Sequence, residues 1–290
     1  MTSNLQVLVS GATGTQGGAV ARELLARGHR VRALTRNPQA DTAVALAGLG
    51  ADVAAGDFDD VESLSRAAAG VDAVFVMGTP FGTDPETETR QSIALIDAAA
   101  KRQVPHIVYS SVASALDATG IPHFESKALV EQHLSGLDGD HTVVAPSAFL
   151  VDLVSPWMLP SLLDGRYTFA LPGDLPLQQV AVADIAAFVG LVVEDRNGFA
   201  GQRIELASVE TTGDGVAARL SAWLERTVTY NELPLEVVRQ QMGDDGVRMI
   251  EFFRRGGYTI DIPALHRAYP QVKWHDVDSW IREHDWSGVR

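Results

Sequence analysis

The sequence predicts an α/β protein built on a doubly wound parallel sheet, with a smaller and mainly helical C-terminal lobe. Two observations lead to this class. Through the first half of the 290 residues, short apolar runs typical of buried strands alternate with segments of helical periodicity. Beyond residue 211 the pattern is mostly helical and includes four of the five tryptophans, which indicates a compact lobe with its own aromatic packing.

The elements of the first half follow one another in strand–helix order. Gly28, Gly50 and Gly70 each follow a segment of helical periodicity, where a left-handed cap residue is expected. The predicted strands cover residues 6–10, 30–35, 52–55, 72–77, 106–110, 142–145 and 203–207. The predicted helices cover residues 17–26, 42–49, 61–69, 87–102 and 125–134, and a further helix begins near Asp184. Because strands joined by helices pair in parallel, the helices are expected to cover both faces of one sheet.

The domain organisation follows from this order. Residues 1–150 are expected to form the sheet domain, and residues 178–207 return to it with a helix and the last strand. Residues 151–177 and 208–290 are expected to form the smaller lobe, which would bind a substrate or a partner.

Composition excludes several classes of function. The 23 Lys and Arg residues against 37 Asp and Glu residues give a formal charge of −14, so the surface should repel phosphate backbones and no direct nucleic-acid binding is expected. The absence of cysteine excludes disulfides and thiolate metal sites. The eight histidines form no HExxH motif, and we therefore expect no metal site.

The N-terminal residues lack the basic segment and long apolar run of a signal peptide, so a cytoplasmic protein is expected. Residues 143–163 are long enough to cross a bilayer and carry a single charge, Asp152. Pro146, Pro156 and Pro160 oppose a membrane-spanning helix, and a buried strand followed by an apolar loop is the preferred interpretation.

A glycine-rich turn at residues 11–17, Gly-Ala-Thr-Gly-Thr-Gln-Gly, follows the first strand and opens the first helix. Gly11 would make the tight turn, Gly14 would let backbone amides approach a pyrophosphate, and Gly17 would let helix and strand pack closely. The free amides and the dipole at the helix N-terminus favour a phosphate there. The alternative is an ordinary glycine-rich turn without a ligand. The residues of this turn expected to bind a dinucleotide are Gly11, Thr13, Gly14, Thr15, Gln16 and Gly17.

The end of the second strand indicates which dinucleotide is bound. Arg36 follows this strand where an acidic residue would bind the ribose hydroxyls of NAD, and a guanidinium there suits a 2′-phosphate, so NADP(H) is the predicted cofactor. A solvated arginine in a turn is the alternative. Asp57 and Phe58 would flank the adenine, whereas Asp59 or Asp60 would cap the next helix. Three residues after the fourth strand would pass beneath the cofactor, namely Gly78, Thr79 and Phe81.

These motifs resemble the NmrA-like family of atypical short-chain dehydrogenases/reductases. The resemblance rests on five segments, which are Gly-Ala-Thr-Gly-Thr-Gln-Gly-Gly at 11–18, Thr-Arg-Asn-Pro at 35–38, Gly-Asp-Phe-Asp-Asp at 56–60, His-Phe-Glu-Ser-Lys at 123–127, and Gly-Gly-Tyr ahead of Tyr-Pro at 269–270. It implies a Rossmann-type NADP(H)-binding domain with a smaller C-terminal lobe. It also implies a choice between two roles, because some members are reductases and others only sense the redox state.

The resemblance also implies a set of candidate catalytic residues. Active short-chain dehydrogenases use a Tyr and a Lys four residues apart on a helix, with a nearby Ser. Lys127 matches that Lys and would touch the nicotinamide ribose, while Ser110 and Ser111 could line the site. His123 stands where the Tyr is expected, so either His123 or Lys127 could supply the proton. The alternative is that His123 merely caps or packs at the start of the helix.

Two other tyrosines, Tyr269 and Tyr109, are not expected to be catalytic. Tyr269 and Lys273 also stand four residues apart, but they lie beyond the dinucleotide-binding core and Pro270 disfavours a helix at Tyr269, so a structural turn is predicted. Tyr109 lies within a predicted strand and is expected to be a core residue. Ser147 lacks a GxSxG context, which leaves hydrolase chemistry without support.

Apolar residues after the sixth strand could form the substrate-binding side. They would suit a flat aromatic, quinone-like or polyketide-like compound near the nicotinamide, with Phe149 also touching the cofactor; equally, they could be core residues of the second lobe. These residues are Phe149, Leu150, Leu153, Trp157 and Met158.

Together these observations predict a cytoplasmic NADP(H)-binding reductase of small conjugated carbonyl compounds that lacks the usual Tyr. The competing hypothesis is a redox sensor that binds NADP(H) without turnover and acts through a protein partner. A homodimer is compatible with either role.

Overall fold

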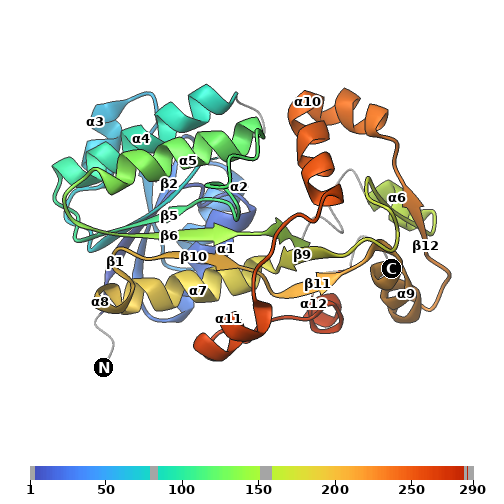
Figure 1. Ribbon diagram of the computed structural model, residues 1–290. Coiled ribbons are helices and arrows are strands. Elements are labelled where there is room, and N and C mark those ends of the chain that lie inside the picture. The colour runs from blue at the N-terminus through green and yellow to red at the C-terminus, as the bar shows by residue number, and fades with distance from the viewer. Residues whose placement is uncertain (1–3, 79–83, 151–158, 284–285, 287–290) are drawn as a thin grey trace. The chain divides into compact units, whose positions relative to one another are not determined.

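The computed structural model describes residues 4–78, 84–150, 159–283 and 286, and the chain divides into two units (Figure 1). Unit 1 comprises Met1–Ala118, Pro122–Ala145 and Ile185–Glu205. Unit 2 comprises Thr119–Ile121, Pro146–Asp184 and Leu206–Arg290. Four segments that the sequence pattern assigned to the sheet domain group with unit 2, namely residues 119–121, 146–150, 178–184 and 206–207.

The main sheet has seven strands in the order β10-β6-β5-β4-β1-β2-β3. The pairs formed among β1 to β6 are all parallel. The strands are β1 (Gln6–Val9), β2 (Arg30–Thr35), β3 (Asp52–Ala55), β4 (Ala73–Met77), β5 (His106–Ser110), β6 (Asp140–Pro146) and β10 (Arg203–Leu206). The order reverses beside β1, so this is the predicted doubly wound arrangement, and every strand of the sheet lies within three residues of its predicted bounds.

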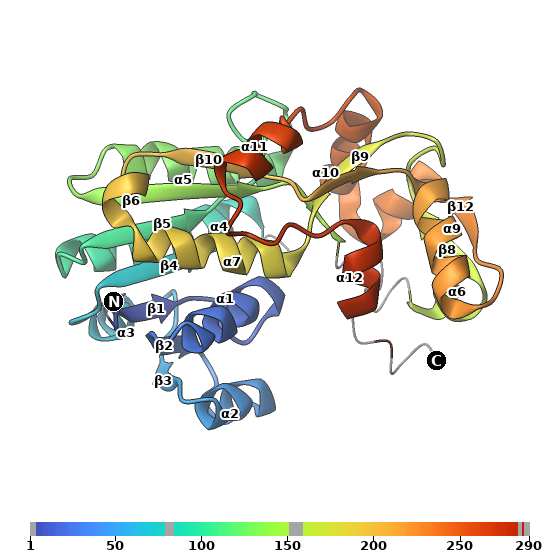
Figure 2. The same cartoon turned by 90° about the horizontal axis from the view of Figure 1, so that it is seen from below.

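Helices cover both faces of this sheet. In Figures 1 and 2, α3, α4 and α5 lie on one face and α1 and α7 on the other. The helices are α1 (Thr15–Ala26), α2 (Asp41–Gly48), α3 (Val61–Ala67), α4 (Pro85–Lys101), α5 (Pro122–Ser135), α7 (Val182–Glu194) and the short α8 (Arg196–Phe199). A core cluster that includes Leu8, Val76, Leu95 and Val130 joins the sheet to α3, α4 and α5. The carboxyl ends of the strands are therefore anchored to helices that carry several of the candidate site residues.

Local signals in the sequence account for several helix ends. Gly28, Gly50 and Gly70 adopt φ values of 86°, 101° and 71°, as predicted for left-handed residues after a helix. Asp60 caps α3, because its carboxylate accepts hydrogen bonds from the backbone amides of Glu62 and Ser63. The expectation that Asp59 or Asp60 would cap this helix is thus confirmed for Asp60.

Unit 2 contains more strands than the sequence pattern indicated. One small sheet has the order β11-β9-β7, and a second pairs β12 with β8 in parallel. The strands are β7 (Ala148–Phe149), β8 (Arg166–Phe169), β9 (Leu177–Val180), β11 (Val209–Thr211) and β12 (Thr229–Glu232). The helices are α6 (Leu159–Leu163), α9 (Gly213–Leu224), α10 (Leu235–Arg254), α11 (Ile262–Ala268) and α12 (Val277–Glu283). Strands of two to four residues are too short to show a clear alternation of apolar and polar residues, so they could not be predicted from the sequence.

The core of unit 2 is aromatic, as the tryptophan count predicted. Trp280 and Trp286 pack edge to face with ring centroids 6.2 Å apart, in a cluster with Leu162, Tyr167 and Leu220. No helix in the described parts of the chain is both long and apolar enough to cross a bilayer.

Candidate dinucleotide-binding site

The glycine-rich turn joins the end of β1 to the start of α1 and packs against the end of β4. The backbone amide of Met77 donates to Oγ of Ser10 over 2.8 Å, which ties the two strand ends together. Gly11 has φ +61°, and a Cβ there would lie 2.7 Å from Sδ of Met77. A Cβ at Gly17 would lie 2.5 Å from the carbonyl oxygen of Ser10 and would also collide with the carbonyl group of Gly11. The fold itself therefore requires glycine at positions 11 and 17.

Gly14 is different, because the fold does not require glycine there. Its backbone is extended, with φ −97°, and the nearest atom to a Cβ at this position would be the carbonyl oxygen of Gly11 at 3.4 Å. Gly14 is also the N-cap of α1, where no side chain caps the helix amides and no acidic residue occupies the first turn. An uncapped end of a twelve-residue helix beside a glycine that packing does not explain fits an anionic group brought close to the backbone.

The other residues of the turn divide between exposed and buried positions. Thr15 is exposed and Thr13 is half-buried. Gln16 is buried, and its Nε2 donates to Oγ of Ser110 at the end of β5 over 2.7 Å. The side chain of Gln16 is thus engaged with β5, and only its backbone amide is available to a phosphate. This contact brings the turn and the candidate residue Ser110 together.

The predicted adenosine end of the site lies at the ends of β2 and β3. These strands are paired, and the backbone amide of Gly56 donates to the carbonyl oxygen of Thr35 over 3.0 Å. Arg36 and Asp57 follow the two strands and are exposed, while Phe58 is half-buried against the core. A guanidinium, a carboxylate and an aromatic ring therefore follow neighbouring strand ends.

Lys127 projects from α5 and is paired with a carboxylate of α4. Its Nζ lies 2.5 Å from Oε1 of Glu88, and the Lys127 and Glu88 side chains are 9% and 1% exposed. Oγ of Ser126 donates to the other oxygen of Glu88 over 2.8 Å. A Cβ at Gly78, after β4, would lie 2.8 Å from Oε1 of Glu88. The structure therefore brings Lys127 and Gly78 together through Glu88.

Ser111 belongs to a second buried polar group. Its Oγ donates to Oε1 of Glu131, one helical turn after Lys127 on α5. The other oxygen of Glu131 accepts from Nε of Arg203 over 2.8 Å, and Nη1 of Arg203 contacts Glu205 at 2.7 Å. Burial lowers the pKa of Arg203, but the hydrogen bonds to Glu131 and Glu205 stabilise its charged form more strongly, so that its pKa is raised. The Ser111 hydroxyl is thus oriented toward the carboxylate.

A family model described as the NmrA-like family matches residues 3–281. The chain belongs to the NmrA-like family. This confirms the resemblance drawn from the sequence motifs.

Relatives of this NmrA-like chain differ in the roles given to them. The Photosystem II assembly factor Ycf39 of Synechocystis sp. is 28% identical over 66% of this chain and 59% of its own length, so this chain matches about three fifths of that protein. The (4-alkanoyl-5-oxo-2,5-dihydrofuran-3-yl)methyl phosphate reductase of Streptomyces griseus is 32% identical over 80% of this chain and 79% of its own length. The structure of Citrobacter sp. triphenylmethane reductase complexed with NADP(H) has a TM-score of 0.81 at 21% identity, covering 96% of this chain and all of that chain.

The NmrA-like chain has no tyrosine suited to proton transfer on α5. His123 stands one helical turn before Lys127 and is 8% exposed, with its ring edge to face with that of Phe124. Tyr109 is fully buried in β5, as predicted for a core residue. Burial raises the pKa of Tyr109 well above its ordinary value, and the nearby Glu88 and Glu131 carboxylates raise it further. Tyr109 is thus a core residue of the sheet and does not take the place of the missing Tyr on α5.

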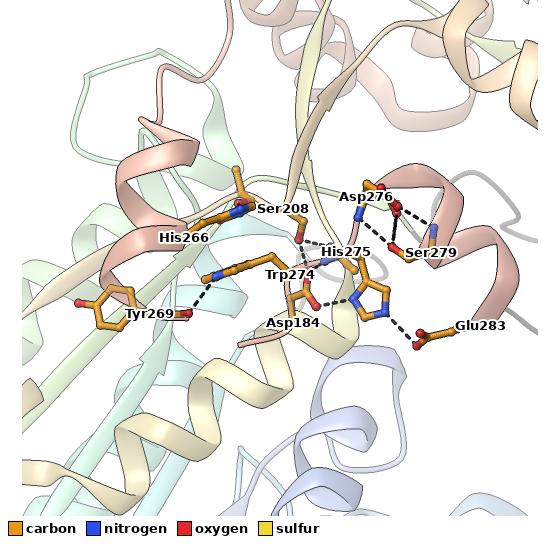
Figure 3. A network of polar contacts seen from close by, with 11 residues as sticks. Asp184, Ser208, His266, Tyr269, Trp274, His275, Asp276, Ser279 and Glu283 are labelled. Carbon is orange, nitrogen blue, oxygen red and sulfur yellow. Dashed lines mark hydrogen bonds and ion pairs between the residues drawn. The ribbon is translucent and has the colours of Figure 1, made fainter. Parts of the chain in front are cut away.

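The segment from Tyr269 to Lys273 forms a turn, as predicted. Tyr269 follows the last residue of α11 and is not helical, and its carbonyl oxygen accepts from Nε1 of Trp274 over 3.0 Å. Figure 3 shows the polar network that follows this turn, in which the His275 ring lies between Asp184 and Glu283. This network connects the C-terminal segment with the first turn of α7. It therefore has a structural role within unit 2.

Several predicted residues belong to unit 2 or lie outside the described residues. Phe149 is half-buried in β7, and Leu150 is fully buried in the core cluster of unit 2. The predicted cofactor contacts Thr79 and Phe81 lie outside the described residues, and so do Leu153, Trp157 and Met158 of the predicted apolar mouth. A cavity of about 410 Å³ lies at the opposite edge of the sheet, lined by residues before β5 and β6 such as Pro105 and Gly139.

The polar partners of the candidate residues were not predicted from the sequence. They are Glu88, Glu131, Arg203 and Glu205. Glu131 could have been found, because it stands four residues after Lys127 and so shares its helical face. Glu88 is one of several acidic residues at the start of α4, and no local pattern separates it from its exposed neighbour Glu86.

Proposed function

We propose that this chain binds NADP(H) at the glycine-rich turn and acts in the cytoplasm as an NADPH-dependent reductase of small conjugated carbonyl, quinone-like or polyketide-like compounds. The observation that carries the proposal is the uncapped N-terminus of α1 beside Gly14, a glycine that the packing of the protein does not require. A backbone pyrophosphate contact explains both features.

Residues at different strand ends would bind different parts of the cofactor. Backbone amides of residues 11–17 would bind the diphosphate, Arg36 the 2′-phosphate, and Asp57 and Phe58 the adenosine. Ser110 and Lys127 would orient the nicotinamide ribose, and Ser111 would line the reacting side. Thr79, Phe81 and Phe149 complete the proposed set of contacts.

Bound NADPH would supply a hydride to an electrophilic carbon of the substrate, and one proton would complete the reduction. A conjugated alkene would give the saturated carbonyl compound, a carbonyl group the hydroxyl, and a quinone the hydroquinone. His123 or a water molecule is proposed to supply that proton. Two reductases among the relatives support this class of reaction, and the name of the Streptomyces enzyme describes an alkene conjugated to two carbonyl groups.

The cofactor assignment can be tested with Arg36→Ala. Loss of one charged contact should weaken NADPH binding by about 1.5 to 3 kcal/mol and leave NADH binding unchanged. Isothermal titration calorimetry measures both affinities, and Arg30→Ala at the opposite end of β2 is the matched control. Equal losses for the two nucleotides would exclude Arg36 as the selecting residue, and no binding of either nucleotide to the wild type would refute the proposed function.

A redox sensor that binds NADP(H) without turnover is the second candidate, favoured by the absence of a Tyr at position 123. Stopped-flow oxidation of NADPH against a panel of quinones and enones separates the two roles. Turnover that falls in Lys127→Ala supports the reductase. Tight NADPH binding with no oxidation by any compound would instead support a sensor that acts through a protein partner or as a homodimer.

A further inference from the structure

Arg203 of β10 contacts its own strand, α5 and the residues that follow β5, all within unit 1. Its Nε donates to Oε2 of Glu131 on α5 over 2.8 Å, and its Nη1 donates to Oε1 of Glu205 over 2.7 Å. Its Nη2 donates to the backbone carbonyl oxygen of Val112 over 3.1 Å. The guanidinium therefore joins an edge strand of the main sheet to the helix and to the turn that lie beside it.

These contacts fix the four residues after β5, which form the 111–114 segment. The backbone amide of Ser114 donates to Oε1 of Glu205 over 2.9 Å, so the carboxylate that binds the guanidinium also holds the far end of the segment. Ser114 has a φ of 61°, a left-handed conformation that residues other than glycine adopt less readily. At the near end, the amide of Ser111 donates to the carbonyl oxygen of Val144 in β6 over 2.8 Å. The segment is thus held at both ends as well as by the guanidinium in its middle.

The Ser111 hydroxyl is oriented by the same contacts. Ser111 is 5% exposed, and its hydroxyl donates to Oε1 of Glu131. Because Arg203 donates to the other oxygen, Glu131 acts as an acceptor at both oxygens. A hydroxyl group has one proton and two lone pairs, so Ser111 can still accept a hydrogen bond from a ligand but has no proton left to donate.

The 111–114 segment begins beside residues that are proposed to bind the dinucleotide. Ser110, the last residue of β5, accepts from Nε2 of Gln16 in the glycine-rich turn over 2.7 Å. Glu131 stands one helical turn after Lys127 on α5. The nicotinamide half of NADPH carries hydrogen-bond donors in its carboxamide and in its ribose hydroxyls. A serine that can only accept is suited to such a partner.

Stability alone does not account for these charges. The side chains of Arg203 and Glu131 are 22% and 7% exposed, and replacing such a buried ion pair with apolar residues is often neutral or stabilising. We propose that Arg203 is a positioning residue, which fixes the 111–114 segment so that Ser111 accepts a hydrogen bond from the nicotinamide half of the cofactor. This inference rests on the proposed function.

Calorimetry with NADPH and with adenosine 2′,5′-bisphosphate tests the role of Arg203, because the bisphosphate lacks the nicotinamide half. Arg203→Met should weaken NADPH binding at least about tenfold and change binding of the bisphosphate by less than about twofold. Arg196→Met is the matched control, at an exposed arginine of unit 1 that pairs with Asp140, and it should change neither affinity. Equal weakening of the two ligands in Arg203→Met, or no weakening of NADPH, would overturn the inference.

Ser111→Ala tests the route of the effect and leaves the ion pair of Arg203 intact, so it remains informative if Arg203→Met does not fold. It should weaken NADPH binding about as much as Arg203→Met, and the double variant should bind no more weakly than either single variant, since both remove the same contact. An unchanged NADPH affinity in Ser111→Ala, or losses that add in the double variant, would show that Arg203 does not act through Ser111.

The fluorescence of bound NADPH gives a spectroscopic readout, because it depends on the surroundings of the nicotinamide ring. At saturating protein, its emission should differ between the wild type and Ser111→Ala, and identical emission would contradict the inference. These failures would leave the proposed function intact. Absence of NADPH binding to the wild type would instead refute the proposed function itself.

Discussion

His275 should make the stability of unit 2 fall in alkali. Its Nδ1 lies 2.5 Å from Oδ1 of the buried Asp184, and its Nε2 lies 3.0 Å from Oε2 of Glu283 (Figure 3). Ser208 and the backbone amide of His275 also donate to Asp184. Carboxylates on both ring nitrogens favour the imidazolium form, because only that form has two N–H donors.

The expected magnitude follows from the pKa. The hydrogen bond to Asp184 raises the pKa of His275 from 6.5 to about 9, against the opposing effect of burial, and Glu283 adds to the rise. At about 1.36 kcal/mol per pH unit, and with little weight given to the exposed Glu283, the pair contributes about 2 to 3 kcal/mol to folding. Between pH 6.5 and pH 9 the folded protein binds more protons than the unfolded chain. The contribution is therefore complete below pH 6.5 and lost as the pH rises through about 9.

Urea unfolding followed by tryptophan fluorescence measures this loss, since all five tryptophans belong to unit 2. The free energy of unfolding of the wild type should fall by about 2 to 3 kcal/mol between pH 6 and pH 9.5, and His275→Gln should abolish most of this pH dependence. His133→Gln, at a histidine of unit 1 that pairs with Asp97, should retain it. A flat wild-type profile, or the same alkaline loss in His275→Gln, would refute the reasoning.

Four further predictions concern three glycines and one helix cap. Gly14→Ala should weaken NADPH binding at least about tenfold in calorimetry without lowering the melting temperature, whereas Gly17→Ala should destabilise the protein by about 1 to 3 kcal/mol in urea. A melting temperature that drops in Gly14→Ala would show that the fold needs this glycine after all. Gly78→Ala should displace Glu88 and lower the free energy of unfolding by about 1 to 3 kcal/mol, and an unchanged value would contradict the close packing. Asp60→Ala should cost about 1 kcal/mol in the same assay through loss of the α3 cap, and no loss would argue against that cap.

The parallel sheet could be predicted because each of its elements carries a local signal. Strands such as residues 30–35 and 106–110 are short segments with a core of apolar or β-branched residues between glycine or polar breaks, and their observed bounds equal the predicted ones. The small sheets of unit 2 carried no such signal. β9, for example, reads Leu-Gln-Gln-Val, and its polar residues are buried because other segments of unit 2 pack over them, as Gln178 shows by bonding with the backbone of Ile260.

In the candidate site, too, some features could be predicted from the sequence and others could not. The glycine-rich turn was recognisable from the sequence, because the spacing of its glycines reflects steric limits on the backbone that act within a few residues. The need for Gly17 and the freedom at Gly14 became distinguishable only from the atoms around each Cβ. Likewise, the sequence placed Lys127 on a helix but left its counter-charge unknown.

The amino-acid order alone was therefore enough to predict the parallel sheet, the turn that opens α1 and membership of the NmrA-like family. These depend on periodicity and backbone sterics, which act between neighbours in the chain. The pairing of charged side chains, in contrast, became known only from the packed fold. Glu88 and Lys127 are 39 residues apart, and Glu131 and Arg203 are 72 apart. Their pairing depends on how helices and strands pack, because a buried charge is stabilised by whichever counter-charge the fold brings within reach.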